Sequence, residues 1–327
     1  MNHEISEVII IGAGPAGCSS AAYASRAGIS PLVLDQRVSL SGKARMDDSP
    51  KSAEDALGAT LMGEMLDQAE NFGAKFIARD VTHVDLMHRT KRVIDGTGAV
   101  HRAKSVIIAT GARRRELGLQ NEEQLTGYGI SRFAAYGGSW YQNMNVFIVG
   151  GGDMALEEAI SLSRFARKVT VVHRREKVRA SKIMQDRVRR HKKIHVIPNH
   201  EVTGIVGDGK VTGIRVCEMS GRGEGVLPAD RVLISIGYEP QVQLIKGQIS
   251  LNHAGYVAVE GRSSRTNVDG VFACGEVVDH EYRQVMSAAG SGCAAALDAE
   301  RYLAALNDCT SPSEARIEAT AVAELAY

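Results

Sequence analysis

Two stretches of this 327-residue chain share one pattern, and this pattern restricts the possible folds more than any other feature. Residues 7–35 and residues 146–173 each contain an apolar strand, clustered glycines, a helix with apolar periodicity and a second apolar strand. The glycines allow a tight turn and a close approach of the backbone to a pyrophosphate, and the N–H groups at the start of the helix face the phosphates. Both stretches are therefore predicted to be Rossmann-like dinucleotide-binding units.

The glycines of the two stretches occupy corresponding places. In the first stretch, the residues that form the turn and open the helix are Gly12, Gly14, Ala16 and Gly17. In the second stretch, Gly150, Gly152 and Ala155 stand at the places of Gly12, Gly14 and Gly17, and Gly151 and Asp153 belong to the same turn and helix start. In this motif the first glycine allows the turn, the second admits the phosphates, and a small third residue keeps helix and strand close together. We expect each set to hold the pyrophosphate of a bound dinucleotide.

The residue that ends the second strand differs between the stretches. Asp35 lies 35 − 12 = 23 residues after Gly12, and the equivalent position, 150 + 23 = 173, is His173. A carboxylate accepts a hydrogen bond from a free ribose 2′-OH, whereas a 2′-phosphate needs charge-assisted, bidentate donors. The second stretch supplies such donors directly after its strand, as Arg174, Arg175 and Arg179. The first stretch is therefore predicted to bind FAD and the second NADPH.

Three other strands, each bounded by glycine, predict further cofactor contacts. Residues 105–112 form an apolar strand that closes on Thr-Gly, as in flavin domains at the point where the chain leaves for the next domain. Residues 232–240 nearly repeat this apolar strand with its glycine. Residues 270–277 form a strand bounded by glycine that carries an acidic residue, and a helix of small residues follows. This pattern predicts a second segment that holds the cofactor. The residues of these strands expected to contact FAD are Thr110, Gly111, Gly275 and Glu276.

Together these segments predict an α/β fold with two Rossmann-like, three-layer ββα domains. The NADPH domain, residues 116–244, is expected to be inserted into a discontinuous FAD domain formed by residues 1–115 and 245–327. A tail helix is expected from about residue 311, because Ser, Pro and Glu there follow a helix-start pattern.

The composition gives no sign of other functional classes. The net charge of +1 gives no reason to expect a nucleic-acid partner, and the longest apolar runs are too short to cross a membrane. The N-terminus has no apolar signal core, so a cytoplasmic location is expected. The five cysteines are scattered with no pair at C-x-x-C spacing, which favours free thiols in a reducing compartment. No metal-binding cluster is visible in the sequence.

Six motifs, which occur in one order along residues 12–284, are GAGPAG, ATGA, GGGDMALEEA, HRREKVRA, GVFACGEV and DHEYRQ. Together they resemble the small, two-domain thioredoxin reductases, over the chain to about residue 305. The resemblance implies a homodimer whose FAD and NADPH domains rotate relative to one another, with hydride transfer from NADPH to the flavin. It also implies that the helix start at Arg283 and Gln284 stabilises the charge of the reduced flavin.

The chain departs from this family where the redox dithiol is expected. Phe133 and Tyr136 stand at the two cysteine positions, and Gly137 stands where the family has an acid. Thiol–disulfide exchange requires a thiolate, so conventional thioredoxin reduction is predicted to be lost. The expected function is an NADPH-dependent FAD oxidoreductase whose flavin passes electrons directly to a small molecule or an electron-carrier protein. In this interpretation Phe133 and Tyr136 are catalytic candidates.

A second departure concerns the surroundings of the flavin. Residues 36–55 lack the Gly-Gly-Gln and Asn-x-Pro-Gly runs that the family carries there, and Glu276 replaces the usual Asp. Either the flavin faces a different reactant or it is held weakly. A non-catalytic dinucleotide-binding dimer, serving as a sensor or scaffold, is therefore a competing hypothesis.

Particular residues support two further hypotheses about the function. The tail could carry Tyr327 over a flavin, as in thioredoxin-reductase-like ferredoxin/flavodoxin–NADP reductases, or simply pack on its own domain. Residues 164–193 contain thirteen Lys or Arg against two acidic residues, and would dock ferredoxin or flavodoxin or form a solvated face. Cys18, in the first turn of the FAD helix, is instead the candidate nucleophile of a single-cysteine low-molecular-weight disulfide reductase.

Overall fold

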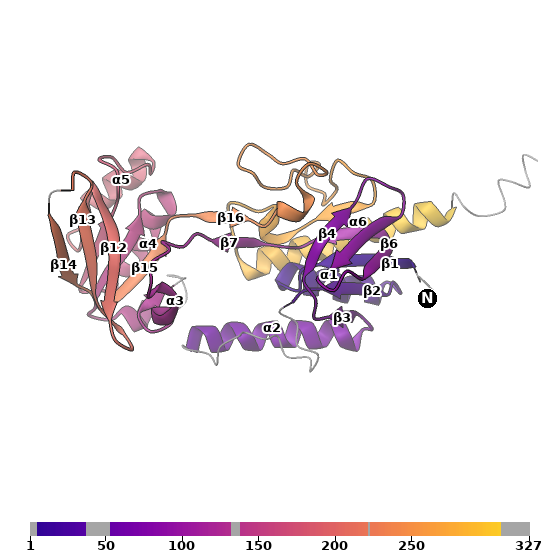
Figure 1. Cartoon of the computed structure of the whole chain (residues 1–327), viewed down its shortest axis with the longest axis horizontal. Coiled ribbons are helices and arrows are strands. Elements are labelled where there is room, and N and C mark those ends of the chain that lie inside the picture. Colours follow the sequence, from indigo (N-terminus) through magenta and orange to yellow (C-terminus); the bar gives the residue numbers. More distant parts are fainter. Residues whose placement is uncertain (1–4, 37–52, 132–137, 222, 309–327) are drawn as a thin grey trace, which may run out of the picture. The chain divides into compact units, whose positions relative to one another are not determined.

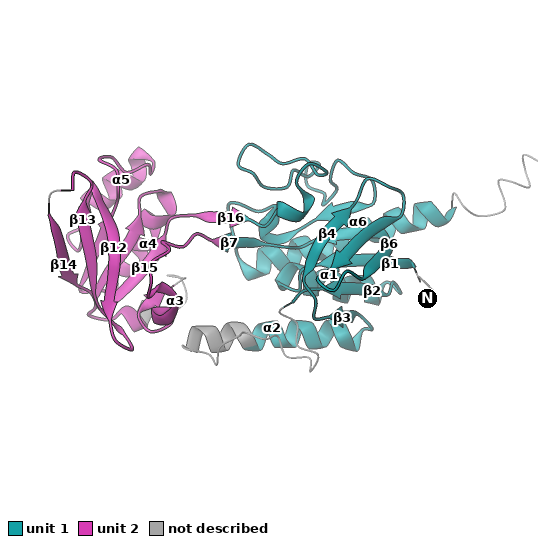
Figure 2. Cartoon of the chain, in the orientation of Figure 1, with its two compact units in different colours: residues 1–49, 57–113, 240–327 teal, residues 50–56, 114–239 magenta. Residues whose placement is uncertain are grey.

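The computed structural model describes residues 5–36, 53–131, 138–221 and 223–308 (Figure 1). The chain forms two compact units, shown in different colours in Figure 2. Unit 1 comprises residues 1–49, 57–113 and 240–327, and unit 2 comprises residues 50–56 and 114–239. Unit 1 is therefore built largely from chain segments that precede and follow unit 2.

Unit 1 is organised by a seven-stranded sheet of order β3-β2-β1-β6-β5-β4, in which β17 also pairs with β6. These strands are β1 (Ile5–Ile11), β2 (Pro31–Leu34), β3 (Lys75–Ile77), β4 (Val81–Asp85), β5 (Lys91–Asp95), β6 (Val100–Ile108) and β17 (Val271–Ala273). The pairs β1–β2, β1–β6, β2–β3 and β6–β17 are parallel, whereas β4–β5 and β5–β6 are antiparallel.

Both faces of strand β1 are buried from Val8 to Ile11, which explains why these four residues are all apolar. Successive side chains of a strand point to opposite faces. Val8 and Ile10 accordingly enter the core that contains helices α1 (Pro15–Arg26) and α6 (Val285–Asp308). Ile9 and Ile11 enter the other core, which includes residues from β4 and β5 and from the segment 245–277. Unit 1 also contains α2 (Ala53–Asn71) from residue 57 onward and two short 3-10 helices, η2 (Gln243–Ile245) and η3 (Gly275–Val277).

Unit 2 contains a five-stranded parallel sheet of order β11-β10-β9-β15-β8 and a three-stranded antiparallel sheet of order β12-β13-β14. The parallel strands are β8 (Ile130–Ser131), β9 (Asn145–Gly150), β10 (Lys168–Val172), β11 (Ile194–Ile197) and β15 (Arg231–Ser235). The antiparallel strands are β12 (His200–Gly207), β13 (Val211–Glu218) and β14 (Glu224–Pro228). The helices are α3 (Glu122–Leu125), η1 (Gly138–Tyr141), α4 (Asp153–Ser163) and α5 (Lys182–Arg189).

The core of unit 2 repeats the alternation seen in unit 1. Val146 and Ile148 of β9 pack with residues of α4 and α5, whereas Phe147 and Val149 pack with residues of the antiparallel sheet. In each unit, one face of the central parallel strands therefore packs against helices, and the other face packs against residues of antiparallel strands. The prediction of two Rossmann-like, three-layer domains is confirmed.

Two short strands carry the chain between the units. The chain leaves unit 1 within β7 (Ala112–Arg114) and returns within β16 (Tyr238–Pro240), and these two strands pair with each other.

Candidate functional site

The glycine turn of unit 1 has no room for side chains at two of its positions. Gly12 has a φ of +107°, and a Cβ on it would lie 2.3 Å from the carbonyl oxygen of Ala109. A Cβ on Gly17 would lie 1.9 Å from the carbonyl oxygen of Gly12. In contrast, a Cβ on Gly14 would meet nothing within 4 Å. The turn is therefore closed on the protein side and open at Gly14, the N-cap of α1.

The start of α1 offers backbone donors without competition from side chains. No described side chain caps Gly14, and the first turn of the helix contains no acidic residue. Pro15 occupies the first turn, where it sacrifices no helical hydrogen bond. Such a helix start attracts a phosphate group.

The carboxylate that follows β2 is tied to this turn. Asp35 is 9% exposed, and its Oδ2 accepts a hydrogen bond of 2.8 Å from the backbone N–H of Ala13. The second strand thus ends beside the glycine turn, as its place in the motif predicts. Asp35 stands where the sequence places the ribose-binding group of the FAD site.

Residues distant in sequence complete the cradle around α1. Gly275 has a φ of +76°, and a Cβ on it would lie 2.8 Å from the Cβ of Ala16. A Cβ on Gly292 of α6 would lie 2.1 Å from the carbonyl oxygen of Ala16. Ala16 is therefore a close-packing position between α1, η3 and α6. Glu276, half-buried in η3, follows Gly275 in the chain.

The segment before α6 is folded around Asp279. Its carboxylate accepts hydrogen bonds from the backbone N–H groups of Glu281, Tyr282 and Arg283 and from the Ser287 hydroxyl. Burial acts to raise the pKa of Asp279, but these hydrogen bonds outweigh burial and hold the pKa below its usual value. They also support Arg283 in a left-handed conformation, with a φ of 50°. Arg283 and Gln284 are the two residues directly before α6.

Thr110 and Gly111 lie at the end of β6, where the chain begins to leave unit 1. The Thr110 hydroxyl donates to the carbonyl of Gln241 at 2.7 Å, and the Gly111 carbonyl accepts from the N–H of Gln241 at 2.9 Å. Gly111 has a φ of +72°, which favours glycine. These two residues anchor the returning chain to the outgoing one.

The glycine turn of unit 2 is crowded by different partners. A Cβ on Gly150 would lie 2.2 Å from the carbonyl oxygen of Ser235, and a Cβ on Gly151 would lie 2.3 Å from Nδ1 of His173. Gly152 is the N-cap of α4 and has open space at the Cβ position. At the third place of the motif Ala155 is fully buried.

The turn of unit 2 is also tied to the segment that follows β10. The Gly151 carbonyl accepts from the N–H of Arg179 at 2.7 Å, and Asp153 Oδ1 accepts from the N–H of Ser181 at 2.8 Å. Ser181 in turn caps α5 by accepting from the N–H of Met184. The chain carrying the arginines is thereby held next to the glycine turn.

His173 follows β10 and is buried. The residue is 6% exposed, and its Nε2 lies 3.2 Å from the carbonyl oxygen of Lys177. Burial lowers the pKa of His173, and the nearby arginines lower it further. These arginines are all exposed: Arg174, Arg175 and Arg179. The edge of unit 2 thus presents positive charge where unit 1 presents a carboxylate.

The structure gives Cys18 a packing role. It is fully buried, its Sγ donates to the carbonyl of Ala13 at 3.2 Å, and it packs with Leu66. Burial, with the negative charges of Asp35 and Glu70, raises the pKa of the Cys18 thiol to about 12. Burial likewise raises the pKa of Cys274 to about 12. Thiols with such pKa values remain protonated at neutral pH and are poor nucleophiles.

Several residues singled out in the sequence lie outside the described residues. These are Phe133 and Tyr136 of the altered dithiol segment, Tyr327 and the tail helix expected from residue 311, and most of the flavin loop at 36–55.

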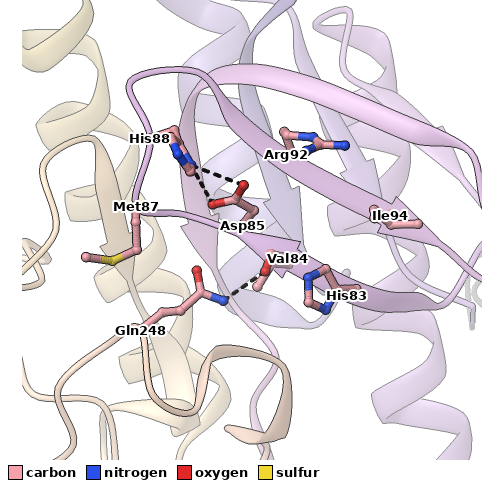
Figure 3. Close-up of a pocket in the computed structure, with 8 residues that line it drawn as sticks. All are labelled: His83, Val84, Asp85, Met87, His88, Arg92, Ile94 and Gln248. Atoms are coloured by element: carbon pink, nitrogen blue, oxygen red, sulfur yellow. Dashed lines mark hydrogen bonds and ion pairs between the residues drawn. The ribbon is translucent and has the colours of Figure 1, made fainter.

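A hollow in unit 1 was not foreseen from the sequence (Figure 3). It is lined by His83, Val84, Asp85, Met87, His88, Arg92, Ile94 and Gln248. The Gln248 side chain pairs with the backbone around the end of β4, accepting from the N–H of Leu86 at 2.7 Å and donating to the carbonyl of Val84 at 2.8 Å. His88 Nδ1 lies 2.9 Å from Asp85 Oδ1. Within the described residues, no group of three or more His, Cys, Asp or Glu could hold a metal ion.

Sequence reasoning also missed a largely buried polar cluster in unit 2, in which Ser235 is buried and Arg114, Glu158 and Tyr238 are half-buried. Glu158 follows the second glycine turn on α4, and Ser235 belongs to the strand that repeats the signal of residues 105–112. The positions of Glu158 and Ser235 in these motifs were the only features of the sequence that could have indicated the cluster. Their proximity depends on tertiary packing, which the spacing of the residues in sequence does not show.

The sequence of this chain matches the family model for pyridine nucleotide-disulphide oxidoreductases over residues 6–292. Thioredoxin reductase of Streptomyces clavuligerus is 46% identical over 315 residues, which are 95% of this chain and 98% of that protein. Thioredoxin reductase of Mycolicibacterium smegmatis is 45% identical, over 92% of this chain and 97% of that protein. The solved structure of thioredoxin reductase from Giardia duodenalis has a TM-score of 0.78 at 36% identity, covering 92% of this chain and 99% of that chain.

These similarities bear out the expected cofactors. Members of the thioredoxin reductase family use FAD and NADPH, so the prediction of an NADPH-dependent flavoprotein oxidoreductase is confirmed. Among the described helices, none is long and apolar enough to span a membrane.

The same similarities correct the function predicted from the sequence. Relatives at 44–46% identity carry the name thioredoxin reductase, so the prediction of direct electron transfer to a small molecule or an electron carrier is wrong. The competing hypotheses, a ferredoxin/flavodoxin–NADP reductase, a single-cysteine disulfide reductase and a non-catalytic dimer, are not favoured either. The prediction gave the residues at positions 133, 136 and 137 more weight than similarity along the whole chain.

Proposed function

The chain belongs to the pyridine nucleotide-disulphide oxidoreductases and, within them, to the thioredoxin reductase family, and we propose that it is an NADPH-dependent thioredoxin reductase. The observation that carries this proposal is similarity over nearly the full length of relatives with that name. The proposed partner is thioredoxin, and the proposed assembly is a homodimer.

In this proposal unit 1 holds FAD. The start of α1 at Gly14 receives the pyrophosphate, and Asp35 accepts a hydrogen bond from a ribose hydroxyl. The closed packing at Gly12, Gly17 and Ala16 supports this assignment, because it brings two helices and a strand together without side chains in between. Further proposed contacts come from Thr110, Gly111, Gly275, Glu276, Arg283 and Gln284.

Unit 2 is proposed to hold NADPH. Gly150, Gly152, Asp153 and Ala155 form its phosphate turn, and the exposed arginines after β10 bind the 2′-phosphate through charge-assisted hydrogen bonds. The ring of His173 packs against Gly151, and burial lowers its pKa, so we assign it to positioning the turn. Bound FAD supplies the chemistry of accepting a hydride and passing two electrons onward.

The sequence places a sharp condition on this proposal. The chain has no cysteine pair at C-x-x-C spacing, and Phe133 and Tyr136 occupy the positions at which the family carries its dithiol. The overall reaction consumes NADPH, a proton and one disulfide, and releases NADP and two thiols. Electrons must therefore pass from the flavin to the thioredoxin disulfide without a pair of cysteines at residues 133 and 136 to carry them.

The test is NADPH oxidation by the purified, FAD-loaded protein with oxidised thioredoxin in the absence of oxygen. We expect loss of NADPH absorbance that depends on thioredoxin and yields free thiols. Flavin bleaching by NADPH without any thioredoxin-dependent turnover would overturn the proposed partner, although the protein would still be an NADPH-dependent flavoprotein.

A matched pair of variants makes this test decisive. The double substitution Phe133→Cys and Tyr136→Cys supplies a dithiol at the family spacing, and Phe133→Ser with Tyr136→Ser changes the same residues without adding sulfur. If wild type and the serine variant are silent and the cysteine variant reduces thioredoxin, the wild-type chain is not a thioredoxin reductase. Turnover by wild type that the serine variant retains supports the proposal.

A further inference from the structure

The positive charge of this chain is concentrated in one segment of unit 2. Residues 164–193 contain thirteen Lys or Arg and two acidic residues, a net charge of 13 − 2 = +11, whereas the whole chain carries +1. The rest of the chain therefore carries 1 − 11 = −10. The three arginines after β10 that are proposed to bind the 2′-phosphate account for only part of this excess.

The exposed face of α5 carries much of the remaining excess. Met184 and Val188 are the buried residues of this helix, and they pack in one core with residues of α4. Asp186, the only acidic residue of α5, pairs with Arg189 at 3.1 Å. Five other basic residues on α5 and directly after it are exposed, and we call them the α5 basic surface: Lys182, Arg187, Arg190, Lys192 and Lys193.

The α5 basic surface is not neutralised by acidic neighbours. Within the described part of the chain, the ion pairs of unit 2 involve other basic residues. Lys193 Nζ donates to the Ala166 carbonyl at 2.9 Å, which holds this side chain in place without cancelling its charge. The surface therefore presents its positive charge to the solvent.

This surface begins beside the glycine turn that is proposed to hold NADPH. Ser181, the N-cap of α5, donates its N–H to Asp153 Oδ1 at 2.8 Å, and Asp153 opens α4 directly after the turn. From Ser181, α5 continues for eight residues, or about 12 Å. Arg190 and Lys192 follow its far end. This distance is comparable to the Debye length of about 10 Å at 0.1 M salt, so their charges still act near the turn.

NADPH is a polyanion, because its 2′-phosphate adds about two negative charges to those of the pyrophosphate. Charge of one sign gathered at a site raises the local concentration of oppositely charged ligands and speeds their association. We propose that the α5 basic surface steers NADPH to unit 2 and thereby favours NADPH over NADH at the association step. The inference rests on the proposed assignment of NADPH to unit 2, and it adds residues that select the cofactor without contacting it.

The test measures association and dissociation separately. Stopped-flow mixing of the FAD-loaded protein with etheno-NADP+, a fluorescent, oxidised analogue that binds without hydride transfer, gives kon and koff. Etheno-NAD+, which lacks the 2′-phosphate, is the matched ligand. The double substitution Arg190→Gln and Lys192→Gln should lower kon for etheno-NADP+ about threefold at about 0.01 M salt and change koff less than about twofold. The fall in kon should be smaller for etheno-NAD+, because it carries less charge.

Salt and a control variant distinguish steering from a change in the fold. At about 1 M salt the Debye length is about 3 Å, so kon for etheno-NADP+ should become equal in wild type and the double variant. Lys210→Gln with Arg215→Gln is the control, because it removes the same charge from exposed residues at β13. The residues of β13 pack on the other face of the parallel sheet from α5. This control should leave kon unchanged.

Proposed contact residues should behave differently from steering residues. Replacing Arg174 and Arg175 with Ala removes direct donors to the 2′-phosphate, so koff for etheno-NADP+ should rise, and the rise should persist at high salt. Flavin content and thermal unfolding verify that each variant is folded.

The outcomes are distinguishable. If neither etheno-NADP+ nor NADP+ itself binds wild type, the proposed NADPH site fails and the inference falls with it. If wild type binds them, only the inference is overturned by an unchanged kon in the double variant, by an equal fall in the control, or by a fall that persists at high salt. An unchanged kon with a raised KM for thioredoxin would also overturn it, and would assign the α5 basic surface to a protein partner.

Discussion

In unit 1 the glycine turn is closed by a carboxylate, whereas in unit 2 the corresponding position holds an imidazole followed by arginines. Asp35 accepts a hydrogen bond from the backbone of its turn, while His173 packs its ring against Gly151. The backbone plan is common to both units, because in each the first glycine abuts the end of a neighbouring parallel strand. In the proposed function, the strand–turn–helix architecture sets where a dinucleotide binds, and the residues after the second strand set which one.

The largest effect on stability is expected from the close packing of the glycine turn, which both units share. Gly17→Ala places a Cβ 1.9 Å from the carbonyl oxygen of Gly12, so α1 must move away from the turn. We expect a loss of about 3 kcal/mol in the free energy of unfolding, with loss of bound flavin. Gly14→Ala is the matched control, since its Cβ position is open. Thermal unfolding and flavin content measure both, and equal effects would show that close packing does not shape the turn.

The next effect concerns the charge that distinguishes unit 2. Replacing Arg174 and Arg175 with Ala removes charge-assisted donors to a 2′-phosphate, and should lower kcat/KM for NADPH about 10- to 100-fold. The kcat/KM for NADH should remain unchanged. Arg189→Ala, an exposed arginine on α5 that pairs with Asp186, serves as the control. A parallel fall for NADH would mean that the arginines support the fold and not cofactor choice.

The carboxylate of unit 1 gives the corresponding test for FAD. Asp35→Ala leaves the N–H of Ala13 without its acceptor and removes the expected ribose contact, so FAD affinity should fall about tenfold. Asp35→Asn keeps an acceptor for one of these donors and should lie between wild type and the alanine variant. Fluorescence titration of the apoprotein with FAD measures this order. Unchanged affinity in both variants would remove Asp35 from the site.

A smaller effect depends on pH. The pKa of Asp279 is lower in the folded chain than its ordinary value, so its stabilising contribution is present above that value and is lost as the pH falls through the lowered one. Asp279→Asn should therefore lower Tm at neutral pH, and the difference from wild type should shrink below about pH 4. Thermal unfolding across this range provides the measurement. A difference independent of pH would show that the carboxylate charge does not order the segment before α6.

The smallest effect is expected at Cys18. Its thiol is buried and has a pKa raised to about 12, so it stays protonated at neutral pH. Cys18→Ala should change turnover less than about twofold, with a modest loss of stability from a small cavity. Turnover assays with and without a thiol-alkylating reagent check this. Loss of activity in a folded variant would give the thiol a chemical role that its burial argues against.

Local spacing was sufficient to predict the fold. The repeated strand–glycine–helix–strand pattern indicates two Rossmann-like units because each element depends on neighbours within about thirty residues. The same local argument gave too much weight to Phe133 and Tyr136, since a short segment was taken to outweigh similarity across 315 residues. The hollow at Gln248 could not be foreseen, because Gln248 meets β4 across more than 160 positions of the chain.

Glycine order and charge at the strand ends, both written in the sequence, determined that this protein has two dinucleotide-binding units with different chemistry. Only tertiary structure decided which polar atoms are buried together, as with Glu158 and Ser235, or which helix backbones touch, as at Ala16 and Gly292. The physical reason is that turns and helix starts depend on short-range geometry. Burial and hydrogen-bond pairing depend instead on contacts between segments that are far apart along the chain.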